Sequence, residues 1–342
     1  MFPASIGLNL MQCVLSGILL LGALNLRAAP GPSAFNVSDF GATGDGFSDD
    51  TESFRQAIVA AGHAGRQVSV PVGRYLITSP LILEDVLLMG SQSGGWPADS
   101  RPMPTLLVRT SGSAPTIVAK MGAAIHGILI DYDYGADEKQ EFGPAIQIEG
   151  GGVSIVNTFI HNPTTGIASN PSTNNGRVNL ENIFIVNPRK VGVQFEFGLD
   201  IITIRNVEVW NYLPEMLRTS TGFRIGHADE IRISNCAVVG AAIGFHFIET
   251  KLPDGRLGRV WGGMSNSTVD FSGIGVKIDT ANVLRITGGS IWAHHYGIVV
   301  DGGVTRRRSR MVCAYWRFSF RLADPSLLSS PPLKRLHEHF II

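Results

Sequence analysis

A short repeated pattern in the middle of the chain restricts its fold more than any other feature. Each copy reads apolar, any, apolar, any, asparagine. Copies lie at 153–157, 178–182, 202–206 and 231–235; glycine replaces the asparagine at 284–288, and 123–127 is expected to begin the series. The asparagines follow one another at intervals of 25, 24 and 29 residues. Self-similarity at a period of about 20 to 50 residues indicates a solenoid, in which each unit buries its apolar face against the next.

A second pattern follows these copies: a glycine and then two apolar residues with one residue between them. It occurs at 192–195, 222–225, 244–247, 275–278 and 297–300. Short β-branched strands, no helices between them and one asparagine per repeat predict an all-β parallel β-helix. The stacked asparagines are expected to form a ladder of turn-bonding side chains, which is a structural role.

The composition is compatible with such a fold and excludes other classes. Glycine supplies 40 of the 342 residues, about 12% against a usual ~7%, so many turns are expected. With 44% hydrophobic and 16% charged residues, the chain can bury a sizeable core. It is therefore neither disordered, nor a coiled coil, nor a polycationic nucleic-acid binder. Three cysteines are too few for a disulfide framework.

Residues 35–58 predict a short strand, a glycine-rich turn and a helix. Asp49 and Glu52 have the spacing of a capping box. The residues after them place an apolar stripe on one face of the predicted helix, which consists of Phe54, Ala57, Ile58 and Ala61. Residues 68–78 then alternate apolar and polar side chains, as a half-buried pair of strands does.

Together these segments read D-F-G-A-x-G-D-G-x-x-D-D-T-x-x-F-x-x-A-I and V-x-V-P-x-G-x-Y-x-I. They closely resemble the opening of the pectate lyase superfamily, in its rhamnogalacturonase-like, epimerase-like and phage-tailspike-like subgroup. The resemblance implies a right-handed parallel β-helix over 31–303, with an N-terminal capping helix that covers its open end. It also implies that Asp45, Asp49 and Asp50 are structural turn and cap residues; a calcium loop is the less favoured alternative.

Polar side chains occupy equivalent outward positions on successive second strands. Because neighbouring strands stack about 4.8 Å apart, these side chains should form one polar and basic stripe, containing Gln194, Arg224, His246 and Lys277. The residues that close the same strands should form a carboxylate stripe, containing Glu196, Glu249 and Asp279. Such a groove suits an extended, anionic sugar polymer, although a solvated sheet face can have the same pattern.

Insertions between repeats mark where a solenoid commonly builds its binding site. Three are expected, at 131–143, 211–220 and 250–263. Tyrosine and tryptophan beside carboxylates suit sugar stacking and acid/base chemistry, but loop aromatics can equally be lids over the core. With Gln194 from the stripe, the candidate substrate-binding residues are Asp131, Tyr132, Asp133, Tyr134, Tyr212 and Trp261.

Two kinds of chemistry fit the candidate catalytic residues. Glycoside hydrolysis needs two carboxyl groups, about 5 to 5.5 Å apart for retention or about 6.5 to 9.5 Å for inversion. Glu249 with Asp279 approaches the first spacing, and Glu196 with Glu249 the second. A lyase or epimerase instead needs a base and a cation beside a uronate carboxylate, and the stripe offers Arg224, His246 and Lys277. The signatures of the related polygalacturonases, Asn-Thr-Asp, Asp-Asp, Gly-His-Gly and Arg-Ile-Lys, are not present in that order.

The leading hypothesis is a secreted enzyme that cleaves an acidic or pectin-like polysaccharide, by glycoside hydrolysis or uronate lysis. The alternative is a non-catalytic carbohydrate-binding or surface-adhesin solenoid. A polysaccharide is the expected partner, with no nucleic acid and no membrane beyond the N-terminal segment. No cofactor is predicted, except calcium if the protein is a lyase. No metal site is predicted either, because the histidines lack the spacing of ligands.

Both ends differ in style from the repeats. No charged side chain occurs at 6–26, which indicates a secretory signal peptide over 1–30 and a secreted or periplasmic location, with a retained anchor as the alternative. Residues 305–342 carry eight basic and two acidic side chains and no glycine. We interpret 304–342 as an atypical basic tail: a C-terminal cap, a surface-binding extension, or a frameshifted or truncated end.

Overall fold

The computed structural model describes residues 34–62, 67–90, 103–110, 112–132 and 141–301. These residues belong to one compact unit that begins at Ala34. The predicted signal peptide, the basic tail, Asp133 and Tyr134 lie outside the described residues and stay predictions. No helix within the described ranges has both the length and the hydropathy of a membrane span.

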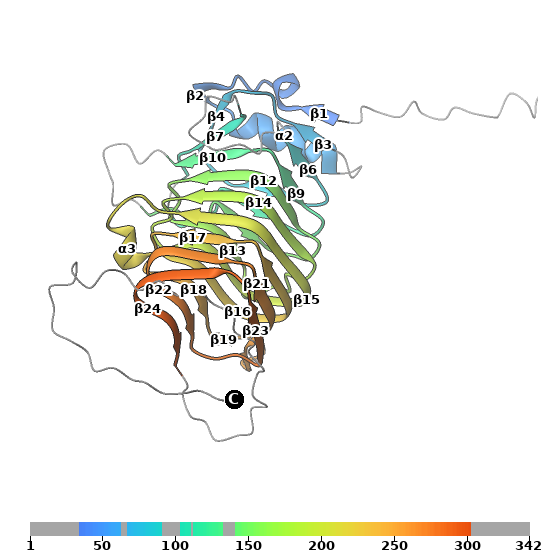
Figure 1. Cartoon of the computed structure of the whole chain (residues 1–342). Coiled ribbons are helices and arrows are strands. Elements are labelled where there is room, and N and C mark those ends of the chain that lie inside the picture. Colours follow the sequence, from blue (N-terminus) through green and yellow to red (C-terminus); the bar gives the residue numbers. More distant parts are fainter. Residues whose placement is uncertain (1–33, 63–66, 91–102, 111, 133–140, 302–342) are drawn as a thin grey trace, which may run out of the picture. The chain divides into compact units, whose positions relative to one another are not determined.

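The strands form a parallel β-helix in which each coil contributes one strand to each of three parallel ladders (Figure 1). This confirms the predicted fold class. Ladder A contains β1 (Ala34–Asn36), β3 (Gln67–Ser69), β6 (Leu87–Met89), β9 (Ala124–His126), the first parts of β12 (Ser154–His161) and β14 (Val178–Val186), later parts of β15 (Val191–Trp210) and β16 (Thr221–Ser234), β21 (Val260–Ser265) and β23 (Val283–Thr287).

Ladder B follows ladder A along the chain, and ladder C follows ladder B. Ladder B contains β2 (Asp45–Asp49), β4 (Arg74–Ile77), β7 (Thr105–Val108), β10 (Leu129–Tyr132), the ends of β12, β14 and β15, β17 (Ala237–Val239), and the starts of β22 (Thr268–Ile278) and β24 (Ser290–Val300). Ladder C contains β5 (Leu81–Leu83), β8 (Ile117–Ala119), β11 (Ile146–Ile148), β13 (Thr165–Ser169), the starts of β15 and β16, β18 (Ile243–Phe247), and the ends of β22 and β24.

The repeated asparagines form the corner between ladders A and B. Asn157, Asn182, Asn206 and Asn235 all have left-handed backbone conformations, with φ between 51° and 53°. The side chains of the first three bond along the stack: Asn182 Nδ2 donates to Asn157 Oδ1 at 3.1 Å, and Asn206 Nδ2 donates to Asn182 Oδ1 at 2.5 Å. Asparagine tolerates this conformation better than most residues, so one side chain both makes the corner and joins adjacent coils. The predicted ladder is confirmed for Asn157, Asn182 and Asn206.

The repeated glycines begin the strands of ladder C, where adjacent coils leave no space for a side chain. A Cβ atom on Gly222 would lie 2.5 Å from Val238 Cγ2 and 2.6 Å from the carbonyl oxygen of Gly244. A Cβ on Gly244 would lie 2.5 Å from the carbonyl oxygen of Gly275. These are far inside van der Waals contact, so close approach of backbones accounts for much of the high glycine content.

One apolar core fills the space between the ladders, and a short helix covers its N-terminal end. Helix α2 (Thr51–Gly62) buries the predicted stripe and packs on β1, β3 and β5. It follows a 3-10 turn, η1 (Val37–Phe40). The cap differs in detail from the predicted capping box. The Asp49 carboxylate accepts hydrogen bonds from the Thr51 N–H and from the Thr78 hydroxyl. It therefore links the start of the helix to the residue that follows β4.

Two corner segments have secondary structure of their own. Helix α3 (Met216–Thr219) lies in the predicted insertion at 211–220, between ladders B and C. Strands β19 (Thr250–Lys251) and β20 (Leu257–Gly258) form an antiparallel hairpin between ladders C and A. The two insertions therefore lie at opposite ends of the ladder C strands.

Candidate functional site

The outward face of ladder C carries the predicted polar stripe. The strand registers align Gln147, Ala168, Gln194, Arg224, His246, Lys277 and Val299 as direct neighbours on successive strands. This set is called the ladder C column below. Its register is confirmed at every step, because side chains alternate between the core and the outer face along each strand.

Asp279 joins two members of the column. It follows β22 directly, and its Oδ2 atom lies 2.8 Å from Nε2 of His246, while its Oδ1 atom lies 3.1 Å from Nζ of Lys277. Burial alone would raise the pKa of Asp279, but the hydrogen bonds from Lys277 and His246 outweigh burial and hold the pKa below its usual value. Asp279 is therefore an ionised acceptor at neutral pH.

His246 lies between two cationic neighbours, Arg224 on one strand and Lys277 on the other. Its side chain is 15% exposed. Burial lowers the pKa of His246; Asp279 opposes that effect, and Lys277 and Arg224 add to it. Because an ionised carboxylate only accepts hydrogen bonds, the proton of neutral His246 lies on Nε2, and Nδ1 is left as a basic nitrogen.

Arg224 forms an ion pair with Glu196 on the neighbouring coil. Gln194 donates from Nε2 to the same Glu196 carboxylate at 2.9 Å. Burial lowers the pKa of the Arg224 guanidinium, and Asp279 opposes that change. An arginine carries five N–H donors, so the guanidinium keeps donors beyond those it directs at Glu196.

Glu249 pairs with a cation outside the ladder C column. It comes two residues after β18, and its Oε2 atom accepts from Nε of Arg259 at 2.8 Å. Arg259 directly precedes β21, on the far side of the hairpin. The sequence did not single out Arg259, because it is one of three basic residues in the insertion at 250–263. The predicted spacings of Glu249 to Asp279 and to Glu196 stay predictions.

Two predicted substrate-binding residues lie on ladder B. Tyr132 is 2% exposed, its hydroxyl lies 2.9 Å from that of Thr116, and its ring packs on Phe142 at 5.1 Å. The prediction that Tyr132 stacks on sugar is therefore wrong. Strand alternation is the reason, because Ile130 and Tyr132 both point into the core and Asp131 points outward. The Oδ1 atom of Asp131 lies 3.1 Å from Nδ1 of His161.

The other two predicted aromatics are exposed, but neither is part of ladder C. Tyr212 is 57% exposed at the corner after ladder B, and its ring centroid is 6.2 Å from that of Trp210. Trp261 is 46% exposed, but it is part of strand β21 in ladder A rather than of a loop. Of the predicted substrate-binding residues that the structure describes, Gln194 is the one that a hydrogen bond joins to the Glu196 and Arg224 pair.

The described residues contain no group of three or more His, Cys, Asp and Glu side chains that could hold a metal ion. In the N-terminal turn, Asp45 accepts from the backbone N–H groups of Phe47 and Ser48 at 2.8 Å. Asp50 accepts from the N–H groups of Thr43 and Gly44. These carboxylates stabilise turns, as the structural interpretation of the motif requires.

The cluster is suited to removing a proton from an anionic substrate. It has a neutral base, His246, with Arg224 and Lys277 as adjacent cations. Hydrolysis would require a protonated carboxyl group, but hydrogen bonds from Lys277 and His246 hold the pKa of Asp279 below its usual value. Glu196 and Glu249 each form an ion pair with an arginine. Burial does raise the pKa of Glu208, but that residue lies on ladder B.

The sequence model of one family matches the N-terminal region. That family is described as rhamnogalacturonase A/epimerase, pectate lyase-like, and the match covers residues 34–101. It agrees with the resemblance carried by the opening motif. No curated protein matches the chain in a sequence comparison.

Solved structures share the fold. The tailspike protein gp49 of Acinetobacter baumannii bacteriophage Fri1, a capsular polysaccharide depolymerase, matches with a TM-score of 0.55 and 14% identity over 79% of this chain and 53% of its own. The phiAB6 tailspike, solved in complex with oligosaccharides of Acinetobacter baumannii surface polysaccharide, matches with a TM-score of 0.49 and 14% identity over 83% of this chain and 49% of its own. The chain thus spans about half the length of these tailspikes.

Proposed function

We propose that this chain, which has the fold and the N-terminal region of pectate lyase-like proteins, is a secreted enzyme that cleaves an acidic polysaccharide. The proposed reaction is β-elimination at a uronate unit bound along ladder C. The observation that carries the proposal is the register of Arg224, His246 and Lys277 on three successive strands, with Asp279 bonded to the second and third.

The proposed elimination needs no cofactor. A uronate carboxylate binds the remaining donors of Arg224 or Lys277, and this neutralisation makes the adjacent C5–H bond more acidic. Nδ1 of His246 removes that proton. The electron pair forms the C4=C5 double bond, the C4–O4 bond breaks, and the leaving oxygen takes a proton from water. Asp279 holds the His246 ring and stabilises the imidazolium that forms.

The comparisons support this proposal at the level of the fold. The Fri1 tailspike is a capsular polysaccharide depolymerase with the same architecture, and at 14% identity it does not specify the glycan or the bond. An acidic glycan is inferred from the two cations that flank His246. A secreted location is inferred from the uncharged segment at 6–26.

The reaction products distinguish a lyase from a hydrolase and from a binding protein. The purified chain would be incubated with polygalacturonate, alginate, hyaluronate and, as a control, a neutral glucan. We expect ultraviolet absorbance from a conjugated uronate on at least one acidic polymer and none on the glucan. Reducing ends without that absorbance would indicate hydrolysis instead. Binding without either signal would indicate the adhesin-like alternative.

The pH profile tests the role of Asp279. Neutral His246 is the active form, so kcat/KM should rise through the pKa of His246 in the free enzyme, which lies below the usual value of about 6.5. Asp279→Asn removes the interactions that raise that pKa. We expect lower kcat/KM and an acidic limb displaced further toward low pH. Lower activity with an unchanged limb would assign Asp279 to another role.

A further inference from the structure

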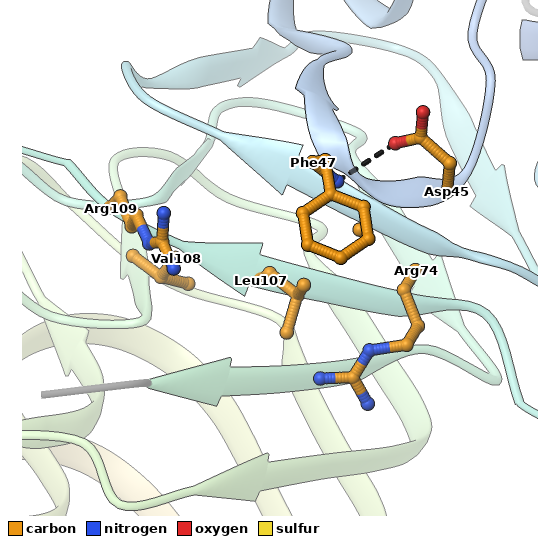
Figure 2. Close-up of a pocket in the computed structure, with 7 residues that line it drawn as sticks. Asp45, Phe47, Arg74, Leu107, Val108 and Arg109 are labelled. Atoms are coloured by element: carbon orange, nitrogen blue, oxygen red, sulfur yellow. Dashed lines mark hydrogen bonds between the residues drawn. The ribbon is translucent and has the colours of Figure 1, made fainter. Parts of the chain in front are cut away.

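A cavity of about 290 Å³ lies on the outer side of ladder B, in the first coils (Figure 2). Its walls come from β2, β4 and β7, which are direct neighbours in the ladder. The lining residues are Asp45, Gly46, Phe47, Arg74, Leu107, Val108 and Arg109. The cavity is separate from the ladder C column both by ladder and by position along the stack, because Arg224, His246 and Lys277 come from much later coils.

A bulge in β2 opens this cavity. Asp45 pairs with Arg74 and Asp49 pairs with Leu76, so four steps along β2 match two steps along β4. Residues 46–48 therefore leave the ladder. The Asp45 carboxylate holds the bulge together, since the Ser48 and Phe47 N–H groups and the Ser48 hydroxyl bond to it and lower the pKa of Asp45 to about 2.

The absence of a side chain at Gly46 leaves space at the base of the cavity. Its φ of 84° is in the left-handed region that favours glycine. A Cβ atom at this position would lie 3.5 Å from Cβ of Arg74 and 3.6 Å from Cδ1 of Leu107. Any side chain here would thus occupy the space between the bulge and the two strands.

The cavity combines an aromatic face with cationic walls. Phe47 is 87% exposed, which is unusual for a phenylalanine and follows from its place in the bulge. In Figure 2 its ring lies beside Leu107, and the guanidinium groups of Arg74 and Arg109 extend on different sides of that leucine. Within the described part of the chain, the Arg74 guanidinium has no ion-pair partner. The Asp45 carboxylate is engaged by its own turn.

We propose that this cavity is an accessory site for a single acidic sugar unit. The face of a pyranose ring stacks on Phe47, and the sugar carboxylate binds the guanidinium of Arg74. The choice of an acidic sugar, rather than another anion, rests on the proposed function. The site anchors the polymer at the N-terminal coils while another part of the same polymer reaches ladder C.

Direct binding of monosaccharides tests the site. Glucuronate, glucose and acetate would each be titrated into the full chain and followed by isothermal calorimetry or ligand-observed NMR. We expect glucuronate to bind with a Kd on the order of 1 mM and the other two at least about tenfold more weakly. Acetate binding as tightly as glucuronate would overturn the proposal, because the sugar ring would then contribute nothing.

Variants locate the binding. Arg74→Ala and Phe47→Ala should each weaken glucuronate binding about tenfold. Arg232→Ala and Val72→Ala are matched controls, since both residues are exposed and neither lines the cavity. Circular dichroism would establish that all four variants fold. Unchanged affinity in both cavity variants would contradict the proposal.

A His246→Ala background separates this site from the proposed reaction. Glucuronate binding should persist there, whether or not turnover is lost. If turnover does occur in the wild-type chain, Phe47→Ala should raise KM for the long polymer and leave kcat on short fragments unchanged. Loss of glucuronate binding in the His246→Ala chain would place the observed binding on ladder C and refute the accessory site.

Discussion

Replacing His246 with alanine should lower turnover of an acidic polysaccharide by about 10² to 10⁴-fold. The reason is geometric: His246 is the base of the ladder C column, flanked by Arg224 and Lys277 in direct register. Its side chain lies on the outer face of β18, so its removal leaves the core intact. The measurement is the initial rate of conjugated-uronate formation, with thermal unfolding followed in parallel.

His161→Ala is the matched control for this variant. His161 also lies near an aspartate, Asp131, at 3.1 Å, but it is on ladder B. Its replacement should change the rate by less than about threefold. If both variants retain full activity, His246 is not the base. If both lose activity together, the loss reflects general destabilisation rather than chemistry.

Replacing Phe223 with alanine should lower the free energy of unfolding by about 3 to 5 kcal/mol. Phe223 is fully buried beneath ladder C, and its ring stacks on Phe245 with centroids 4.7 Å apart and an interplanar angle of 9°. The two phenylalanines directly precede Arg224 and His246 in their strands. Removing the Phe223 ring would therefore leave a new cavity beneath the proposed active site. Denaturant unfolding with an unchanged slope would report the loss as a shift of the midpoint.

Phe223→Leu tests how the loss of unfolding free energy depends on the size of the side chain that remains. It keeps an apolar side chain and most of the packing, so its loss should be clearly smaller than that of Phe223→Ala. Equal losses in the two variants would show that ring stacking, rather than cavity volume, dominates. A loss below about 1 kcal/mol in Phe223→Ala would mean that the coils relax into the space, contrary to the expectation for a close-packed core.

The register of the site could be predicted because it depends on local rules. In a parallel β-helix, equivalent residues of consecutive repeats become neighbours, and side chains alternate between core and solvent. Counting along the repeats was therefore enough to align Arg224, His246 and Lys277. The same alternation assigns Tyr132 to the core beside Ile130.

The partners of the carboxylates could not be predicted in this way. Arg259 reaches Glu249 only because a hairpin folds the chain back between ladders C and A. Asp279 lies against both His246 and Lys277 because the corner after β22 directs its side chain toward the column. Such contacts depend on loop conformations and rotamers that residues far apart in the sequence determine together.

The amino-acid sequence alone determined the solenoid, the asparagine corners and the outward column. It could do so because each of these follows from a period repeated many times along the chain. Only the tertiary structure decided which cation pairs with which carboxylate, and which aromatic side chains are buried. It also revealed the cavity beside Phe47. That cavity lies where a bulge in β2 interrupts the regular register, and the repeat pattern cannot predict such an interruption.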